Sequence, residues 1–164
     1  MNIYLVQHGK PIPKEEDPER PLSAQGIEDV EKMAAFLIKA GIEVDEIFHS
    51  GKTRARQTAE IIASKLNPDK KPLEKRGLSP LDEVKIIAEE IEKIRNDLMI
   101  VGHLPYLAKL TSFLTTGNES NPIVSFQQGG VVCLEKREEG NWSIAWMLIP
   151  GLIKANTQSS QSGS

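Results

Sequence analysis

Cysteine and histidine are scarce in this sequence of 164 residues, which contains one Cys and three His. A single cysteine cannot form a disulfide within the chain, and Cys133 lies in an apolar run typical of a protein core. No cysteine and histidine stand at the spacing of zinc ligands. The sequence therefore argues against a disulfide-stabilised fold and against a metal site.

Long apolar runs and a strong excess of one charge are also missing. No run reaches the length of a transmembrane helix, and the N-terminus lacks the basic, apolar and small-residue pattern of a signal peptide. A net charge of −3 gives no reason to expect nucleic acid or an anionic membrane as a partner. We expect a cytoplasmic protein with one domain over residues 1–154 and a disordered polar tail at 155–164.

An apolar run near the N-terminus leads directly into a histidine and a glycine. Residues 3–6 predict a strand buried on both faces, and Gln7, His8 and Gly9 follow it. Because glycine adopts backbone conformations that other residues avoid, Gly9 is expected to turn the chain out of the strand. His8 then lies at the carboxyl end of a strand, where open α/β sheets bind ligands. For this stretch alone, a turn with an exposed histidine is the alternative.

A second strand, expected at residues 46–48, leads into a helix through residues 50–59. Arg54 falls near the first turn of this helix, where unpaired N–H groups and the helix dipole favour an anion. The planar fork of an arginine suits two phosphate oxygens. A surface arginine on an amphipathic helix is the alternative, and we assign that role to Arg56.

A third apolar strand, at residues 98–101, delivers another histidine beside a glycine. Gly102 and His103 follow it at once, and Pro105 suits the start of a helix. His103 is therefore expected between the carboxyl end of a strand and the amino end of a helix.

The remaining segments complete an alternation of strands and helices. They are a helix capped by Ser23 and ended by Gly41, a short strand at 72–76, a helix opening at Asp82 or Glu83, and a hairpin of strands 131–136 and 142–148. The first of these helices is expected to bury one face, on which apolar residues recur at helical spacing: Val30, Met33, Ala34, Leu37 and Ile38. This order of elements predicts a single-domain α/β fold with a mainly parallel central sheet, helices on both faces and an antiparallel C-terminal hairpin.

Because parallel strands end at one edge, His8, Arg54 and His103 are expected to converge there. A neutral imidazole attacks phosphorus and cations hold its oxygens, so a phosphoryl-transfer site is plausible.

Three motifs resemble the histidine phosphatase (phosphoglycerate-mutase-like) superfamily. They are Gln7-His8-Gly9, the Arg-Ala-x-Gln-Thr-Ala of residues 54–59, and the Val-Gly-His-x-Pro of residues 101–105. The small size and the Arg-Pro-Leu-Ser of residues 20–23 resemble the bacterial phosphohistidine phosphatases of the SixA type. The resemblance spans about residues 2–150, with the motifs in the family's order.

The resemblance implies a metal-independent phosphatase without a cofactor. It makes His8 the nucleophile that forms a transient phosphohistidine, and Arg54 the clamp on the phosphoryl oxygens. His103 would stabilise charge on the transferring group, which requires that it be partly protonated in the complex. The substrate-binding residues expected beside them are Gln7, Gly9 and Arg20. His49 has no role in the family pattern and is expected to be structural.

Two departures from the family pattern bear on activity. Gln7 stands where the family has arginine, and the loss of one preorganised donor at a developing anion costs on the order of 10²–10³ in rate. Lys10 or Lys52 could supply the missing charge. Gly77 stands where many relatives carry a glutamate, with Asp82 and Glu83 as possible substitutes for that general acid.

Without a general acid, an alkoxide is a poor leaving group, whereas the bond in a phosphoramidate is labile. The predicted function is therefore hydrolysis of phosphohistidine on a protein, at a rate that Gln7 could lower. The alternatives are a catalytically impaired module that binds phosphate or a phosphoprotein, and a phosphomonoesterase acting on a small phosphorylated substrate.

Overall fold

The computed structural model describes residues 1–154 and shows one alternating α/β unit; the predicted tail at 155–164 lies outside the described residues. Its elements are β1 (Asn2–Gln7), α1 (Ala24–Lys39), β2 (Glu46–His49), α2 (Thr53–Leu66), β3 (Leu73–Glu74), α3 (Val84–Ile91), β4 (Leu98–Gly102), α4 (Tyr106–Thr116), β5 (Val131–Lys136), β6 (Trp142–Leu148) and a 3₁₀ turn at Pro150–Leu152. Within residues 1–154, no helix is both long and apolar enough to cross a membrane.

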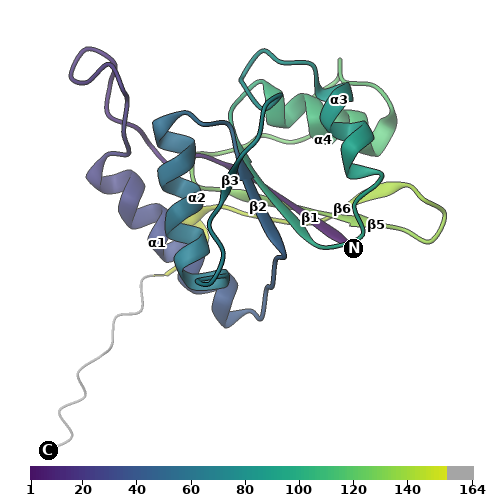
Figure 1. The fold of residues 1–164 in the computed structure, drawn as a ribbon, viewed down its shortest axis with the longest axis horizontal. Helices are drawn as coiled ribbons and strands as arrows, with labels where there is room; N and C mark the ends of the chain where they lie inside the picture. The colour runs from purple at the N-terminus through teal and green to yellow at the C-terminus, as the bar shows by residue number, and fades with distance from the viewer. Residues whose placement is uncertain (155–164) are drawn as a thin grey trace, which may run out of the picture.

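The six strands form one mixed sheet in the order β3-β2-β4-β1-β5-β6. Strands β3, β2, β4 and β1 are mutually parallel, and β5 and β6 add an antiparallel pair at one edge. Helices α1 and α2 cover one face of the sheet, and α3 and α4 cover the other (Figure 1). The fold class predicted from the sequence is confirmed, including the C-terminal hairpin.

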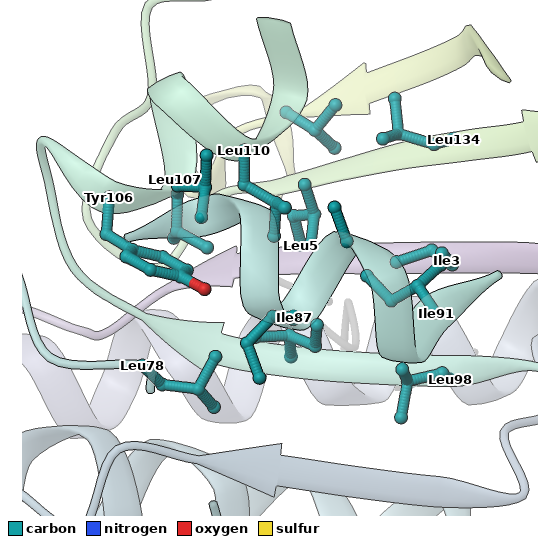
Figure 2. Packing of buried hydrophobic residues seen from close by; sticks show 14 of the residues in the cluster. Ile3, Leu5, Leu78, Ile87, Ile91, Leu98, Tyr106, Leu107, Leu110 and Leu134 are labelled. Atoms are coloured by element: carbon teal, nitrogen blue, oxygen red, sulfur yellow. The ribbon is translucent and has the colours of Figure 1, made fainter. Parts of the chain in front are cut away.

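The two central strands are buried on both faces, which explains their continuous apolar sequences. One apolar cluster lies between these strands and helices α3 and α4. Figure 2 shows part of it, with side chains of both helices lying over the sheet residues Ile3, Leu5 and Leu98. The other cluster packs α1 and α2 against the opposite face. The core therefore holds β1 and β4 rigidly side by side, and these are the strands that precede the two candidate histidines.

Helix α1 begins as predicted, because the Ser23 side chain accepts a hydrogen bond of 3.0 Å from the Gly26 N–H. Two local expectations were wrong. Ile38 was expected on the buried face, yet it is 46 % exposed, because Leu37 takes the inward position and the next residue is rotated by about 100° from it. Strand β3 is shorter than predicted, since it lies at the edge of the sheet and gives way to a turn in which Gly77 has a φ of +90°.

Candidate active site

The parallel pairing of β1 and β4 brings two predicted site residues together. Gln7 stands opposite Gly102 in the register, so the residues that follow leave the sheet at the same level. The His8 N–H donates to the Gly102 carbonyl at 3.0 Å, and the ring centroids of His8 and His103 are 5.0 Å apart. The side chains are 7 % and 2 % exposed. The two imidazoles therefore share one small site at the carboxyl edge of the sheet.

His8 is held as a neutral imidazole in one defined tautomer. Its Nδ1 lies 2.7 Å from the Gly9 carbonyl oxygen, which can only accept, so Nδ1 carries the proton and Nε2 keeps its lone pair. Burial lowers the pKa of His8 to about 4, and the charges of Arg54 and Arg20 act in the same direction. At neutral pH, His8 is therefore uncharged, which is the state that a nucleophilic histidine requires.

Gly9 is needed for a reason other than the one predicted. Its φ is not in the left-handed region; instead, a Cβ at this position would lie 2.8 Å from Val30 Cγ2 and 3.0 Å from the Gly26 carbonyl oxygen. The Gly9 N–H donates to Thr58 Oγ1 at 3.0 Å, and the Thr58 hydroxyl donates to the Arg54 carbonyl at 2.8 Å. Thr58 thus ties the end of β1 to the first turn of α2.

Two guanidinium groups lie beside the histidines. Burial and the nearby charge of Arg20 lower the pKa of Arg54. The Nε atoms of both arginines are buried and have no hydrogen-bond partner within residues 1–154. Arg20 also has a φ of +47°, a conformation that costs a non-glycine residue about 1 kcal/mol or more. This strained and unpaired arrangement of cations is what a site for a bound anion requires.

His103 is a neutral imidazole at neutral pH, whereas partial protonation was expected in the complex. Burial lowers its pKa to about 3, and the charges of His8, Arg54 and Lys52 add to the effect. Its Nε2 lies 2.6 Å from Ser50 Oγ, while its buried Nδ1 has no partner in the described chain. A bound phosphoryl anion would favour the protonated form, because it adds negative charge next to the ring.

The other predicted residues are placed as follows. Gln7 is 8 % exposed, and its Oε1 is buried without a partner among residues 1–154. His49 is structural, as expected, since its Nδ1 accepts from the Gly51 N–H at 3.1 Å. Arg56 is a surface residue that pairs with Glu60 at 3.9 Å.

The two carboxylates considered as a general acid serve the turn before α3. Asp82 Oδ2 accepts from the Ser79 N–H at 2.8 Å, and Glu83 is the N-terminal cap residue of α3, with an exposed side chain. Among residues 1–154, no carboxylate contributes to the pKa of His8, His103 or Arg54. The same residues contain no group of three or more His, Cys, Asp or Glu that could hold a metal ion.

An α/β sheet that delivers two neutral imidazoles and two guanidinium groups to one edge has the chemistry of phosphoryl transfer. The model of the histidine phosphatase superfamily (branch 1) matches residues 3–97, and the chain belongs to this superfamily. It is accordingly a phosphatase, a hydrolase that acts on phosphoryl groups.

Three relatives illustrate the likeness. Phosphohistidine phosphatase SixA of Escherichia coli (strain K12) is 24% identical over 159 residues, which are 94% of this chain and 97% of that protein. A structure of the protein histidine phosphatase SixA complexed with tungstate has a TM-score of 0.81 at 24% identity and covers 94% of this chain and 100% of its own. The alpha-ribazole phosphatase from Shigella flexneri has a TM-score of 0.73 at 16% identity, covering 88% and 94%.

Sequence reasoning missed two residues that organise the site. Ser50 contacts His103 across 53 positions of sequence, and Thr58 contacts Gly9 across 49. Both belong to the segment that was singled out for Arg54, so the signal was present in the motif. Their partners could not be predicted, because each bond depends on how α2 and its preceding loop sit against β1 and β4.

The low pKa values of His8 and His103 make stability depend on pH. In the unfolded chain a histidine titrates near 6.5, so unfolded protein takes up protons first as pH falls. The free energy of unfolding is therefore expected to fall on the order of 2 kcal/mol for each of the two histidines between pH 7 and pH 5. Urea denaturation at the two pH values measures this loss. Titration of the histidine ring protons by NMR provides the check, and values near 6.5 for both rings would contradict it.

Proposed function

We propose that this chain is a phosphohistidine phosphatase in which His8 forms the covalent intermediate. The observation that carries the proposal is the state of His8, which is neutral and donates from Nδ1 to Gly9, so that the Nε2 lone pair is left for attack. Arginines 54 and 20 lie close enough to act on its charge state. A nucleophile among cations is suited to a phosphoryl group, whose oxygens carry the negative charge.

The reaction has two displacements at phosphorus. His8 Nε2 first forms a bond to phosphorus while the P–N bond to the substrate imidazole breaks, and the electron pair stays on that imidazole nitrogen. If the other ring nitrogen of the substrate already carries a proton, the leaving group departs as a neutral imidazole. Water then attacks the phosphorus on His8, and the P–Nε2 bond breaks with its electron pair returning to Nε2. Phosphate leaves with the oxygen from water, and one proton of that water passes to solvent.

The surrounding groups have distinct roles in this proposal. Arg54 grips two phosphoryl oxygens with its fork, and Arg20 adds a second guanidinium. His103 donates from Nδ1 to a phosphoryl oxygen while its Nε2 stays on Ser50. Gln7 offers a neutral amide in place of a charged donor, which lowers the rate without removing the pocket. Gly9 acts through its backbone, by orienting His8.

The substrate class follows from the charges of the site. Asp82 is engaged within the turn by the Ser79 N–H, the exposed Glu83 side chain makes no capping hydrogen bond, and the charges that act on the two histidines come from cations. A serine or sugar phosphate needs an acid to protonate the departing oxygen, which contributes about 10²–10⁴ in rate. A phosphohistidine does not. The likeness to the Escherichia coli phosphohistidine phosphatase supports this choice.

Two rivals remain worth testing, because a specific observation favours each. The shared fold with alpha-ribazole phosphatase favours a phosphomonoesterase acting on a small metabolite. The neutral Gln7, buried in the site, favours a module that binds a phosphoryl group without turnover.

Rates on a panel of substrates separate these functions. We expect hydrolysis of a phosphohistidine-containing protein to exceed hydrolysis of phosphoserine by about 10²–10⁴ in kcat/KM, since only the second needs a general acid. An aryl phosphate with a good leaving group is the control, and it should be hydrolysed faster than phosphoserine. Equal rates on phosphohistidine and phosphoserine would contradict the proposed substrate. Tungstate binding without turnover of any substrate would identify a binding module.

A further inference from the structure

Two lysines, one just after β1 and one just before α2, could bring a further cation to the site. Gln7 supplies an amide where a charge would stabilise a phosphoryl anion, and it is held in the sheet by a bond from its N–H to the Gly130 carbonyl. Of the two lysines considered from the sequence, Lys10 makes its contacts through its carbonyl, which accepts from Ser23. Lys52 is placed differently.

The backbone of Lys52 is fixed next to His103. Its N–H donates to Ser50 Oγ at 3.3 Å, and the same oxygen lies 2.6 Å from His103 Nε2. The loop that carries both residues turns at Gly51, which has a φ of +87° and packs against the Glu74 side chain. The Ser50 hydroxyl group thus links the backbone N–H of Lys52 to the ring of His103.

The charge of Lys52 also reaches the site. It is one of the charges that lower the pKa of His103, whereas Lys10 is absent from the groups acting on either histidine. The side chain is exposed, and it forms no ion pair within the described part of the chain. The two nearby carboxylates contact residues other than Lys52: Glu74 lies against Gly51, and Glu19 accepts from the Thr53 hydroxyl at 3.4 Å.

We propose that Lys52 is a substrate-binding residue whose ammonium group contacts the phosphoryl oxygens and supplies the charge that Gln7 lacks. The proposal rests on the phosphoryl pocket of the proposed function and deepens it. Lysine suits this position because its flexible stem lets a compact charge swing from solvent onto an anion. The simpler alternative is a solvated lysine at the start of α2, with no contact to the ligand.

Tungstate, a tetrahedral oxyanion, tests the contact without requiring turnover. Titration calorimetry should show that Lys52→Met weakens tungstate binding about 5- to 20-fold. Lys65→Met is the matched control, because it removes the same charge from the last turn of the same helix, and its affinity should stay within about twofold of the native protein. An unchanged affinity in Lys52→Met overturns the proposal, and so does a loss in Lys10→Met instead.

A double-mutant cycle with Gln7→Arg tests whether Lys52 compensates for the missing charge. Gln7→Arg alone should tighten tungstate binding, and in that background Lys52→Met should cost clearly less than in the native protein. Equal costs in both backgrounds would show that the two positions are independent and would overturn the compensation. If Gln7→Arg does not fold by circular dichroism, Lys52→Arg decides instead: retained tungstate affinity supports a contact by charge, and an affinity as low as that of Lys52→Met overturns it.

The outcomes distinguish this proposal from the proposed function. If the native chain hydrolyses no phosphohistidine but Lys52→Met binds tungstate more weakly, the proposed function is wrong and the contact of Lys52 with the anion stands. If the native chain hydrolyses phosphohistidine but Lys52→Met binds tungstate with native affinity, the proposed function stands and Lys52 is not a substrate-binding residue.

Discussion

Replacement of His8 by asparagine is expected to reduce phosphohistidine hydrolysis by about 10⁴-fold or more, because it removes the nucleophile. The substitution is chosen to isolate that loss. The Asn amide takes the place of Nδ1–H and can still donate to the Gly9 carbonyl, so the local hydrogen bond is kept while Nε2 is lost. Turnover with a ³²P-labelled substrate measures the rate, and an acid-labile label on the native chain identifies the intermediate.

His49 offers the matched control for this experiment. It lies at the end of strand β2, which pairs with β4, and is 5 % exposed, but its Nδ1 accepts from the Gly51 N–H. In His49→Asn the Oδ1 atom takes over as acceptor, so turnover and labelling should persist. Labelling that survives in His8→Asn would show that the intermediate does not form on His8. Labelling that disappears only in His49→Asn would place the intermediate on His49 instead.

The parts of the fold that could be predicted are those set by local pattern. The hairpin strands β5 and β6 have the expected bounds, whereas β1 extends one residue beyond the expected run at each end and β4 one residue at its carboxyl end. Strands β1 and β4 could be located because a strand buried on both faces leaves an unbroken apolar run. The wrong predictions concern the edge of the sheet and the border of a helix's buried face. Strand β3 is short because the edge of the sheet offers it one neighbour, and Ile38 is exposed because helix rotation carries it out of the packed stripe.

The candidate site could be predicted in outline and not in detail. That His8 and His103 approach each other follows from the parallel sheet, since both leave strands that pair in register. The tautomer of His8 depends on a carbonyl one residue away, and the partner of His103 is Ser50, reached only when β2 and β4 pair. Sequence spacing cannot give these contacts, because they are fixed by the packing of distant segments.

The two guanidinium groups of the site concentrate positive charge that a bound anion would neutralise. Burial and the nearby charge of Arg20 lower the pKa of Arg54, so the charged form of Arg54 is less favourable in the folded protein than in water. Binding of phosphate or tungstate is therefore coupled to folding, because a ligand that binds only the native state stabilises it by mass action. The same groups that cost stability in the free protein provide the affinity for the phosphoryl group.

Substitution of Arg54 is expected to separate activity from stability. Arg54→Lys keeps the charge and loses the planar fork, so kcat/KM should fall by about 10²-fold. Arg54→Leu should fall further, to about 10³-fold, yet its free energy of unfolding should rise by up to about 1 kcal/mol, because a partly buried cation next to Arg20 is removed. Steady-state rates and urea denaturation of the free protein measure the two effects.

Arg56→Leu provides the control on the same helix, two residues away. Arg56 is half-exposed and pairs with Glu60 on the surface, so both activity and the free energy of unfolding should change little. Full activity in Arg54→Lys would show that a point charge suffices and that the fork has no role. A loss of stability in Arg54→Leu that matches its loss of activity would show that Arg54 supports the fold, and would contradict the expected cost of its partly buried charge.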